Sequence, residues 1–279
     1  MKIVISAEST IDMPQEMLDQ YNIKTTPFGI NFNGELVEDR FGISSEIFEY
    51  VDKTKNLPKT SAIPPDQYKQ HFENLKKEYD AIIHISLSSM LSSSFNNAQL
   101  AANDIDNVYV VDSRTLSTGI ALIAITGKEL VDAGKNAKEI YDELVKLTQQ
   151  VQVSFVIEKL NYLHKGGRCS ALTLLGANIL KIKPQIVVKD GRMNVGKKYI
   201  GSLNKVIAKY CDDLLIDNPN PKLDTVFITH SSPMPEIQDM LKEKLKSKGF
   251  KNIYDTLAGG TISSHCGPNC IGVLFINEK

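Results

Sequence analysis

An apolar strand, a serine-rich turn and a helix follow one another within residues 81–102. Residues 81–85 are apolar apart from one histidine, which is typical of a strand buried on both faces. Six serines stand between positions 86 and 94, and apolar residues at 95–102 predict the buried side of a helix. The backbone N–H groups and the dipole at the start of such a helix favour an anion. Alternatively, one serine caps the helix and the others are solvated turn residues.

Strands and helices alternate in the same way through the first 150 residues. The predicted strands are residues 2–6, 24–32, 36–41 and 108–111, with a hairpin turn at Asn33-Gly34. The predicted helices are residues 15–21, 44–52, 66–77, 116–133 and 137–150. This alternation indicates a parallel sheet with helices on both faces, so we expect an N-terminal α/β domain over residues 1–150. Ligands of such sheets bind beyond the carboxyl ends of the strands, where we expect the turns at Ser9, Thr60 and Ser92. Two prolines after Ile63 predict an extended loop around Thr60.

From residue 151 onward the predicted strands outnumber the helices. The predicted strands are residues 153–157, 186–188, 193–195, 198–200, 225–229, 253–257 and 270–276, and the predicted helices are residues 203–216 and 235–248. This pattern predicts a C-terminal α+β domain with a mixed sheet over residues 151–279. Glycines and a proline between residues 259 and 270 predict an irregular loop.

Basic residues are concentrated in one segment of a chain whose net charge is only −1. Nine lysines and arginines lie between Lys159 and Lys198, against the single acid Asp190. The segment is either a solvated face or a docking surface for an acidic or phosphate-bearing partner. Within it, two glycines precede Arg168 and would let the backbone approach a ligand closely. The nearly neutral net charge argues against a general nucleic-acid binder.

The glycine-rich loop also carries a histidine and two cysteines. A metal site would use His265, Cys266 and Cys270, but no second cysteine pair completes a tetrahedral set, so we expect no metal. A cysteine nucleophile activated by His265 lacks a third orienting group in the sequence. A packed or solvated histidine is the remaining interpretation.

Several classes of protein are disfavoured by what the sequence does not contain. No apolar run approaches the ~20 residues that span a bilayer, and the first residues lack the pattern of a signal peptide. We therefore expect a cytoplasmic protein with four reduced cysteines. A phosphate-binding Gly-Lys-Ser/Thr loop is also absent, which argues against ATP use by this chain alone.

A set of motifs along the whole chain resembles the DegV family, the fatty-acid-binding group that includes the FakB subunits of bacterial fatty acid kinase. The matching motifs, in order, are Glu8-Ser9-Thr10-Ile11-Asp12, Thr60-Ser61, Ser88-Ser89-Met90-Leu91-Ser92, Lys165-Gly166-Gly167-Arg168, Ile182-Lys183-Pro184 with Asp190-Gly191, and His265-Cys266-Gly267-Pro268. The chain departs from the usual family pattern at Glu8, at Ser93-Ser94, at Cys266 and at Asn269-Cys270.

The resemblance implies a two-domain α/β protein that holds one long-chain fatty acid between its domains. It implies that Thr60, Ser92 and His265 bind the carboxylate, assisted by the backbone N–H of Ser93. It further implies that the acid is presented to a separate ATP-dependent kinase, that Arg168 contacts the kinase or the phosphate, and that this chain has neither a catalytic group nor a cofactor. The residues that we expect to line the acyl tunnel are Phe28, Ile30, Leu116, Ile120, Ile123, Ala171, Leu174, Leu175 and Ile179.

Two other functional classes stay open at this point. An enzyme acting on a small carboxylate or carbonyl substrate would use His265 as acid or base, and it would need a polar pocket. A lipid carrier or sensor without a kinase would bind an acyl chain but would need no docking role for residues 159–198. We expect a monomer, and the resemblance leaves room for transient contact with a membrane.

Overall fold

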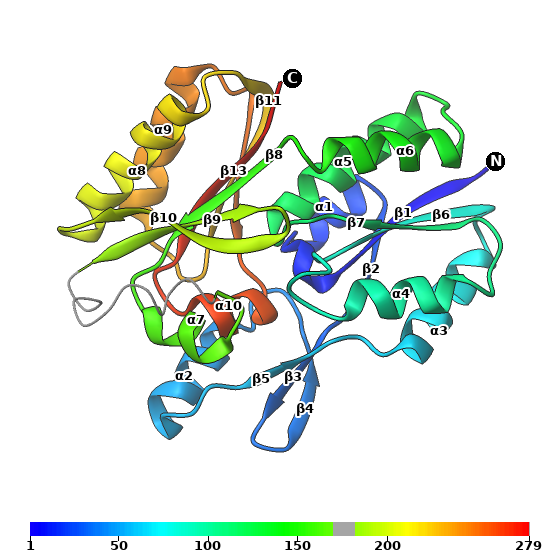
Figure 1. Ribbon diagram of the computed structural model, residues 1–279, viewed down its shortest axis with the longest axis horizontal. Coiled ribbons are helices and arrows are strands. Elements are labelled where there is room, and N and C mark those ends of the chain that lie inside the picture. Colours follow the sequence, from blue (N-terminus) through cyan, green and yellow to red (C-terminus); the bar gives the residue numbers. More distant parts are fainter. Residues whose placement is uncertain (170–181, 279) are drawn as a thin grey trace.

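The computed structural model describes residues 1–169 and 182–278 (Figure 1). Its N-terminal part is built on a four-stranded parallel sheet with the strand order β2–β1–β6–β7. These strands are β1 (Ile3–Glu8), β2 (Ile23–Thr26), β6 (Ala81–Ser86) and β7 (Val108–Asp112). Strands β1 and β6 are buried along their whole length, which explains their runs of apolar residues.

Helices cover both faces of this sheet, as predicted (Figure 1). Two lie on one face, α3 (Pro65–Lys76) and α4 (Ser94–Ala102), and two on the other, α5 (Thr118–Asp132) and α6 (Ala137–Leu147). The short elements η1 (Ser9–Ile11) and α1 (Gln15–Gln20) follow β1. Helix α5 is apolar on nearly every side because it also packs against the second sheet, where it contacts β8, β11 and β13.

The C-terminal part contains a mixed six-stranded sheet with the order β10–β9–β8–β13–β11–β12. Strands β11 and β12 pair in parallel, whereas the other neighbours are antiparallel. The strands are β8 (Val151–Val156), β9 (Lys183–Lys189), β10 (Arg192–Tyr199), β11 (Pro221–His230), β12 (Asn252–Leu257) and β13 (Ile271–Asn277). Helices α8 (Leu203–Asp217) and α9 (Pro235–Lys248) pack on its outer face (Figure 1). The predicted fold class is therefore confirmed.

A small third sheet, with the order β4–β3–β5, contains the hairpin predicted at Asn33-Gly34 but departs from two other sequence predictions. Its strands are β3 (Gly29–Phe32), β4 (Glu35–Glu38) and β5 (Lys59–Ser61), and α2 (Ser44–Thr54) lies between β4 and β5 in the chain. The single strand predicted over residues 24–32 is wrong, because Pro27 separates β2 from β3 and lacks the N–H that a continuous ladder requires. Thr60 lies on a strand rather than in a loop, paired with Ile30.

The irregular loop predicted over residues 259–270 is also wrong. Residues 260–266 form the helix α10 (Gly260–Cys266), which packs beside α7 (Leu160–Gly166). The carboxylate of Asp39 accepts hydrogen bonds from the backbone N–H groups of Gly260, at 2.7 Å, and Thr261, at 3.1 Å. Gly260 allows a close approach to the third sheet, because a Cβ there would lie 2.3 Å from Cδ1 of Ile30. The hydrogen bonds from Gly260 and Thr261 to Asp39, which is distant in the sequence, stabilise the start of a helix in this glycine-rich segment.

The largest hydrophobic core is shared by both major sheets. It joins residues of β1 and β6 to Val153, Phe155 and Leu274 of the C-terminal sheet. Because this core crosses residue 150, the division into domains at that position stays a prediction. Among the described residues, no helix combines the length and the apolar composition that crossing a membrane requires.

Candidate functional site

A cavity of about 100 Å³ lies where the sequence predicts a ligand site, next to the turns that follow β6 and β7. Its lining residues are Phe28, Thr60, Ala62, Leu87, Leu91, Ser92, Ser93, Leu116, Arg168, Met193, Thr261, Ile262, His265 and Cys266. All five residues nominated for the site, Thr60, Ser92, Ser93, Arg168 and His265, are among them. The structure thus brings together residues from four distant parts of the chain.

The polar end of the cavity centres on a hydrogen bond between His265 and Thr60. Nε2 of His265, on the last turn of α10, lies 2.9 Å from Oγ1 of Thr60 on β5. In the tautomer with the proton on Nε2, His265 donates to the threonine oxygen, which leaves the Thr60 hydroxyl proton available to a ligand.

His265 is neutral at physiological pH. Its burial and the nearby positive charge of Arg168 lower the pKa of the imidazole to about 4. The polar end of the cavity therefore presents a neutral imidazole and hydroxyl groups, while Arg168 is exposed to solvent.

Gly166, the last residue of α7, fixes the position of this imidazole. A Cβ at residue 166 would lie only 2.3 Å from Nδ1 of His265, so a larger residue would displace the ring. The backbone oxygen of Gly166 also accepts a hydrogen bond from the guanidinium of Arg168, at 2.7 Å. The sequence predicts that the backbone at Gly166-Gly167 approaches a ligand closely. In the structure, the group that lies close to Gly166 is the side chain of His265.

The serine-rich turn is held by hydrogen bonds and also borders the cavity, whereas the alternative of solvated serines is wrong for the fully buried Ser86, Ser88 and Ser94. Oγ of Ser92 accepts a hydrogen bond from the backbone N–H of Ser94, at 3.2 Å, and the residue also lines the cavity. Within the described part of the chain, the backbone N–H of Ser93 has no hydrogen-bond partner. Other serines anchor the turn: Ser88 donates to the oxygen of Gly191 at 2.8 Å, and Ser89 donates to Asp112 at 2.6 Å.

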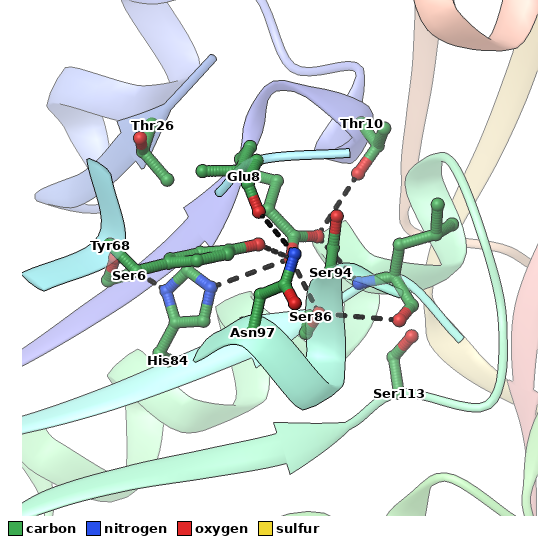
Figure 2. Close-up of polar contacts among 12 residues, drawn as sticks. Ser6, Glu8, Thr10, Thr26, Tyr68, His84, Ser86, Ser94, Asn97 and Ser113 are labelled. Carbon is green, nitrogen blue, oxygen red and sulfur yellow. Dashed lines mark hydrogen bonds and ion pairs between the residues drawn. The ribbon is translucent and has the colours of Figure 1, made fainter. Parts of the chain in front are cut away.

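A fully buried carboxylate, Glu8, supports this turn from the end of β1 (Figure 2). It accepts hydrogen bonds from the hydroxyl of Tyr68 at 2.6 Å, the hydroxyl of Ser86 at 2.5 Å and the backbone N–H of Leu87 at 2.6 Å. Nε2 of His84 lies 3.7 Å from Oε1 of Glu8, which is beyond hydrogen-bond distance.

These contacts keep Glu8 ionised. Burial alone would raise the pKa of Glu8, but the contact with His84 and the hydroxyls of Ser86 and Tyr68 outweigh it and hold the pKa below its usual value. Leu87, whose N–H is bound to this carboxylate, lines the cavity. Sequence reasoning did not identify Glu8 as a support of the site, since its partner Tyr68 is 60 residues away.

A smaller cavity of about 20 Å³ adjoins the first and is mostly apolar. The two cavities share the wall residues Leu116, Ile262 and Cys266, and the second extends toward β8 and β13 at Val153 and Leu274. The second cavity is also bordered by the polar residues Ser117, Thr229, His230 and Ser231. The path proposed below for an acyl chain runs from the first cavity into the second.

The expected tunnel residues fall into three groups. Phe28 and Leu116 line the first cavity, whereas Ile30, Ile120 and Ile123 are fully buried in the cores and line neither cavity. The other four lie outside the described residues: Ala171, Leu174, Leu175 and Ile179. Met193 and Ile262 also line the first cavity, and the sequence does not indicate this, because the direction of their side chains is set by β10 and by the unpredicted helix α10.

No group of three or more His, Cys, Asp or Glu side chains suited to a metal ion occurs in residues 1–169 and 182–278. His265 and Cys266 line the cavity with hydroxyl and apolar side chains instead.

Comparisons with known proteins agree on one family. A DegV domain-containing protein of Staphylococcus aureus is 31% identical over 286 residues, covering 99% of each chain. The structure of DegV, a fatty acid binding protein from Bacillus subtilis, matches with a TM-score of 0.86 and 27% identity, covering 100% of both chains. The fatty acid kinase (Fak) B3 protein of Streptococcus pneumoniae, loaded with linoleic acid, has the same fold, with a TM-score of 0.85 and 20% identity over 100% of both chains. The family model described as "Uncharacterised protein, DegV family" matches residues 2–278, and the chain therefore belongs to the DegV family.

Proposed function

We propose that this protein binds one long-chain fatty acid between its N-terminal domain, residues 1–150, and its C-terminal domain, residues 151–279. Thr60, Ser92 and His265 hold the carboxylate, with the backbone N–H of Ser93 as a further donor. The observation that carries this proposal is the cavity itself, which combines a neutral polar end with otherwise apolar walls. The fatty-acid-binding neighbour from Bacillus subtilis supports the same class of ligand.

The polar end can bind an anion through neutral hydrogen-bond donors. Among the described residues, the only cation that lines this cavity, Arg168, is exposed to solvent. The start of α4 supplies unpaired N–H groups and the positive end of a helix dipole, and Thr60 supplies a hydroxyl donor. A carboxylate bound by such donors keeps its negative charge and remains a nucleophile. A small polar substrate, in contrast, would leave most of the apolar lining without a partner.

Binding of the acyl chain requires the apolar walls to separate. The cavities of about 100 and 20 Å³ are smaller than the roughly 300–1,000 Å³ of most ligand pockets. Met193 and Leu91 are suited to such movement, because Met193 is unbranched and flexible and Leu91 is only partly buried. Each methylene transferred from water into this path contributes about 0.8 kcal/mol.

The bound acid is then offered to a separate ATP-dependent kinase, which forms the acyl phosphate. Arg168 supports this step, because it is exposed and also lines the cavity that holds the carboxylate. In this proposal Arg168 contacts the kinase or the transferred phosphate, and the other basic residues of 159–198 help to attract the partner.

The first test is mass spectrometry of an organic extract of the purified protein, followed by palmitate titration of the delipidated protein. We expect one long-chain acid per chain. Thr60→Val should weaken palmitate binding, whereas Thr54→Val, a matched change at an exposed helical position, should not. Folded protein that carries no acid and takes up neither palmitate nor oleate would exclude fatty-acid binding.

The kinase step is tested separately, with a purified fatty acid kinase catalytic subunit and ATP. Arg168→Ala should slow acyl phosphate formation far more than it weakens palmitate binding. Equal loss of both would assign Arg168 to the carboxylate site and remove its proposed contact with the partner.

A further inference from the structure

Two cysteines border the path proposed for the acyl chain. Cys266, the last residue of α10, lines both cavities, and Cys270, just before β13, lines the smaller one. Both side chains are almost fully buried and neither forms a disulfide. The thiols therefore border the space that the proposed acyl chain would occupy once the apolar walls separate.

The turn between the two cysteines is held in place by Ser231. Its hydroxyl donates a hydrogen bond to the backbone oxygen of Gly267, at 2.6 Å, and accepts one from the N–H of Cys270, at 3.0 Å. Gly267 has a positive φ of 73° and packs against Tyr162, where a Cβ would lie 2.7 Å from the ring. Such a fixed turn keeps the two thiols near one another.

The thiols interact directly, and their roles differ. A hydrogen bond to Cys266, together with burial, raises the pKa of the Cys270 thiol well above its usual value. Cys270 therefore retains its proton at neutral pH.

We propose that Cys266 and Cys270 are a redox-active pair that reduces a hydroperoxide carried on an apolar chain in the cavity. The Cys266 thiolate attacks the terminal peroxide oxygen, the O–O bond breaks, and the lipid alkoxide takes up a proton to leave as an alcohol. Cys270 then attacks the resulting sulfenic acid, which releases water and forms the Cys266–Cys270 disulfide. In sum, one hydroperoxide and two thiols give one alcohol, one water and one disulfide, which a dithiol reductant returns to thiols.

The apolar lining selects the oxidant. Leu116, Ile262 and Leu274 surround the pair, so an apolar hydroperoxide is concentrated beside Cys266, whereas hydrogen peroxide is not. The choice of a fatty-acid hydroperoxide rests on the proposed function, but formation of the disulfide rests on the thiols alone. The two ideas can therefore fail independently.

The experiment exposes delipidated full-length protein to the hydroperoxide of linoleic acid or to hydrogen peroxide, then alkylates remaining thiols and maps the peptides. We expect a mass loss of about 2 Da, a Cys266–Cys270 linkage and one hydroxy fatty acid per disulfide. The lipid hydroperoxide should react at least about tenfold faster, and saturating palmitate should slow it. With dithiothreitol present, alcohol formation should continue beyond one equivalent.

Single substitutions test whether the reaction requires Cys266 and Cys270 and no other cysteine. Cys270→Ser should stop at a sulfenic acid on Cys266 that dimedone labels, and Cys266→Ser should abolish the reaction. Cys211→Ala, at a buried cysteine of the other core, should leave it unchanged. If the wild-type protein binds palmitate but both thiols remain alkylatable after treatment, the redox role is wrong. Equal rates with both peroxides, unaffected by palmitate, would refute delivery through the cavity.

Discussion

Glu8→Gln tests whether one buried charge holds the ligand-binding turn in place. The change preserves the shape of the side chain but removes its charge and replaces one acceptor oxygen with a donor. In the wild type both oxygens accept: Oε1 from Tyr68 and Ser86, and Oε2 from the backbone N–H of Leu87. The amide of glutamine cannot accept at both positions, so at least one buried donor loses its partner.

The expected loss is about 3 kcal/mol of unfolding free energy. A buried donor without a partner costs about 1–3 kcal/mol, and hydrogen bonds to a charged acceptor are each about 1 kcal/mol stronger than those to a neutral one.

The loss should also depend on pH. Because the pKa of Glu8 is lower in the folded protein than in the unfolded chain, its contribution is present above the unfolded pKa of about 4.3 and is lost as pH falls through the folded pKa. The difference between the wild type and Glu8→Gln should therefore shrink in acid. Urea denaturation followed by circular dichroism, at neutral and acid pH, measures both effects.

Glu46→Gln is the matched control, since Glu46 is exposed and forms only a surface ion pair with Arg40. It should change the unfolding free energy by less than about 0.5 kcal/mol. If Glu8→Gln behaved like this control, Glu8 would not be a charged support of the turn. Palmitate affinity should also fall in Glu8→Gln, because Leu87 lines the cavity.

Three further predictions concern the carboxylate site. Ser92→Ala should weaken palmitate binding by about 1–3 kcal/mol in calorimetric titration, and an unchanged Kd would remove Ser92 from the site. Gly166→Ala should also weaken palmitate binding, since its Cβ would displace the imidazole of His265; a crystal structure with the ring unmoved would contradict this. Because the folded pKa of His265 is about 4, below the unfolded value of about 6.5, its ionisation should reduce stability as pH falls from 6.5 to 4. His265→Gln should lack this part of the pH dependence in urea denaturation, and an identical profile would show that His265 is not buried as a neutral group.

The motifs that resemble the DegV family indicate five site residues, and the structure places all five on one cavity: Thr60, Ser92, Ser93, Arg168 and His265. Their roles as ligands remain predictions. Local pattern could indicate Ser92 and Ser93, because a strand, a serine-rich turn and a helix are consecutive in the chain. It could not indicate how these residues meet Thr60 and His265, which lie on β5 and α10 and are 205 residues apart in the sequence.

The tunnel lining was harder to predict, for a related reason. Ile30, Ile120 and Ile123 have the same apolar character as Phe28 and Leu116, yet they fill cores instead of facing the cavity. Hydrophobicity predicts burial, but it does not distinguish a side chain packed against its neighbours from one that borders a space.

The sequence by itself determined most of the succession of strands and helices and the type of both major sheets, because hydrophobic periodicity and turn residues act over a few positions. Only the tertiary structure decided that residues 260–266 form a helix, since the carboxylate of Asp39 that binds its first N–H groups is 221 residues away from Gly260. The same holds for Glu8: Thr10 nearby in the sequence donates one hydrogen bond at 3.4 Å, but the shorter bonds come from Tyr68 and from Ser86 on β6. Caps and buried charges are satisfied by whichever groups folding brings within hydrogen-bond distance, and local sequence carries no record of those groups.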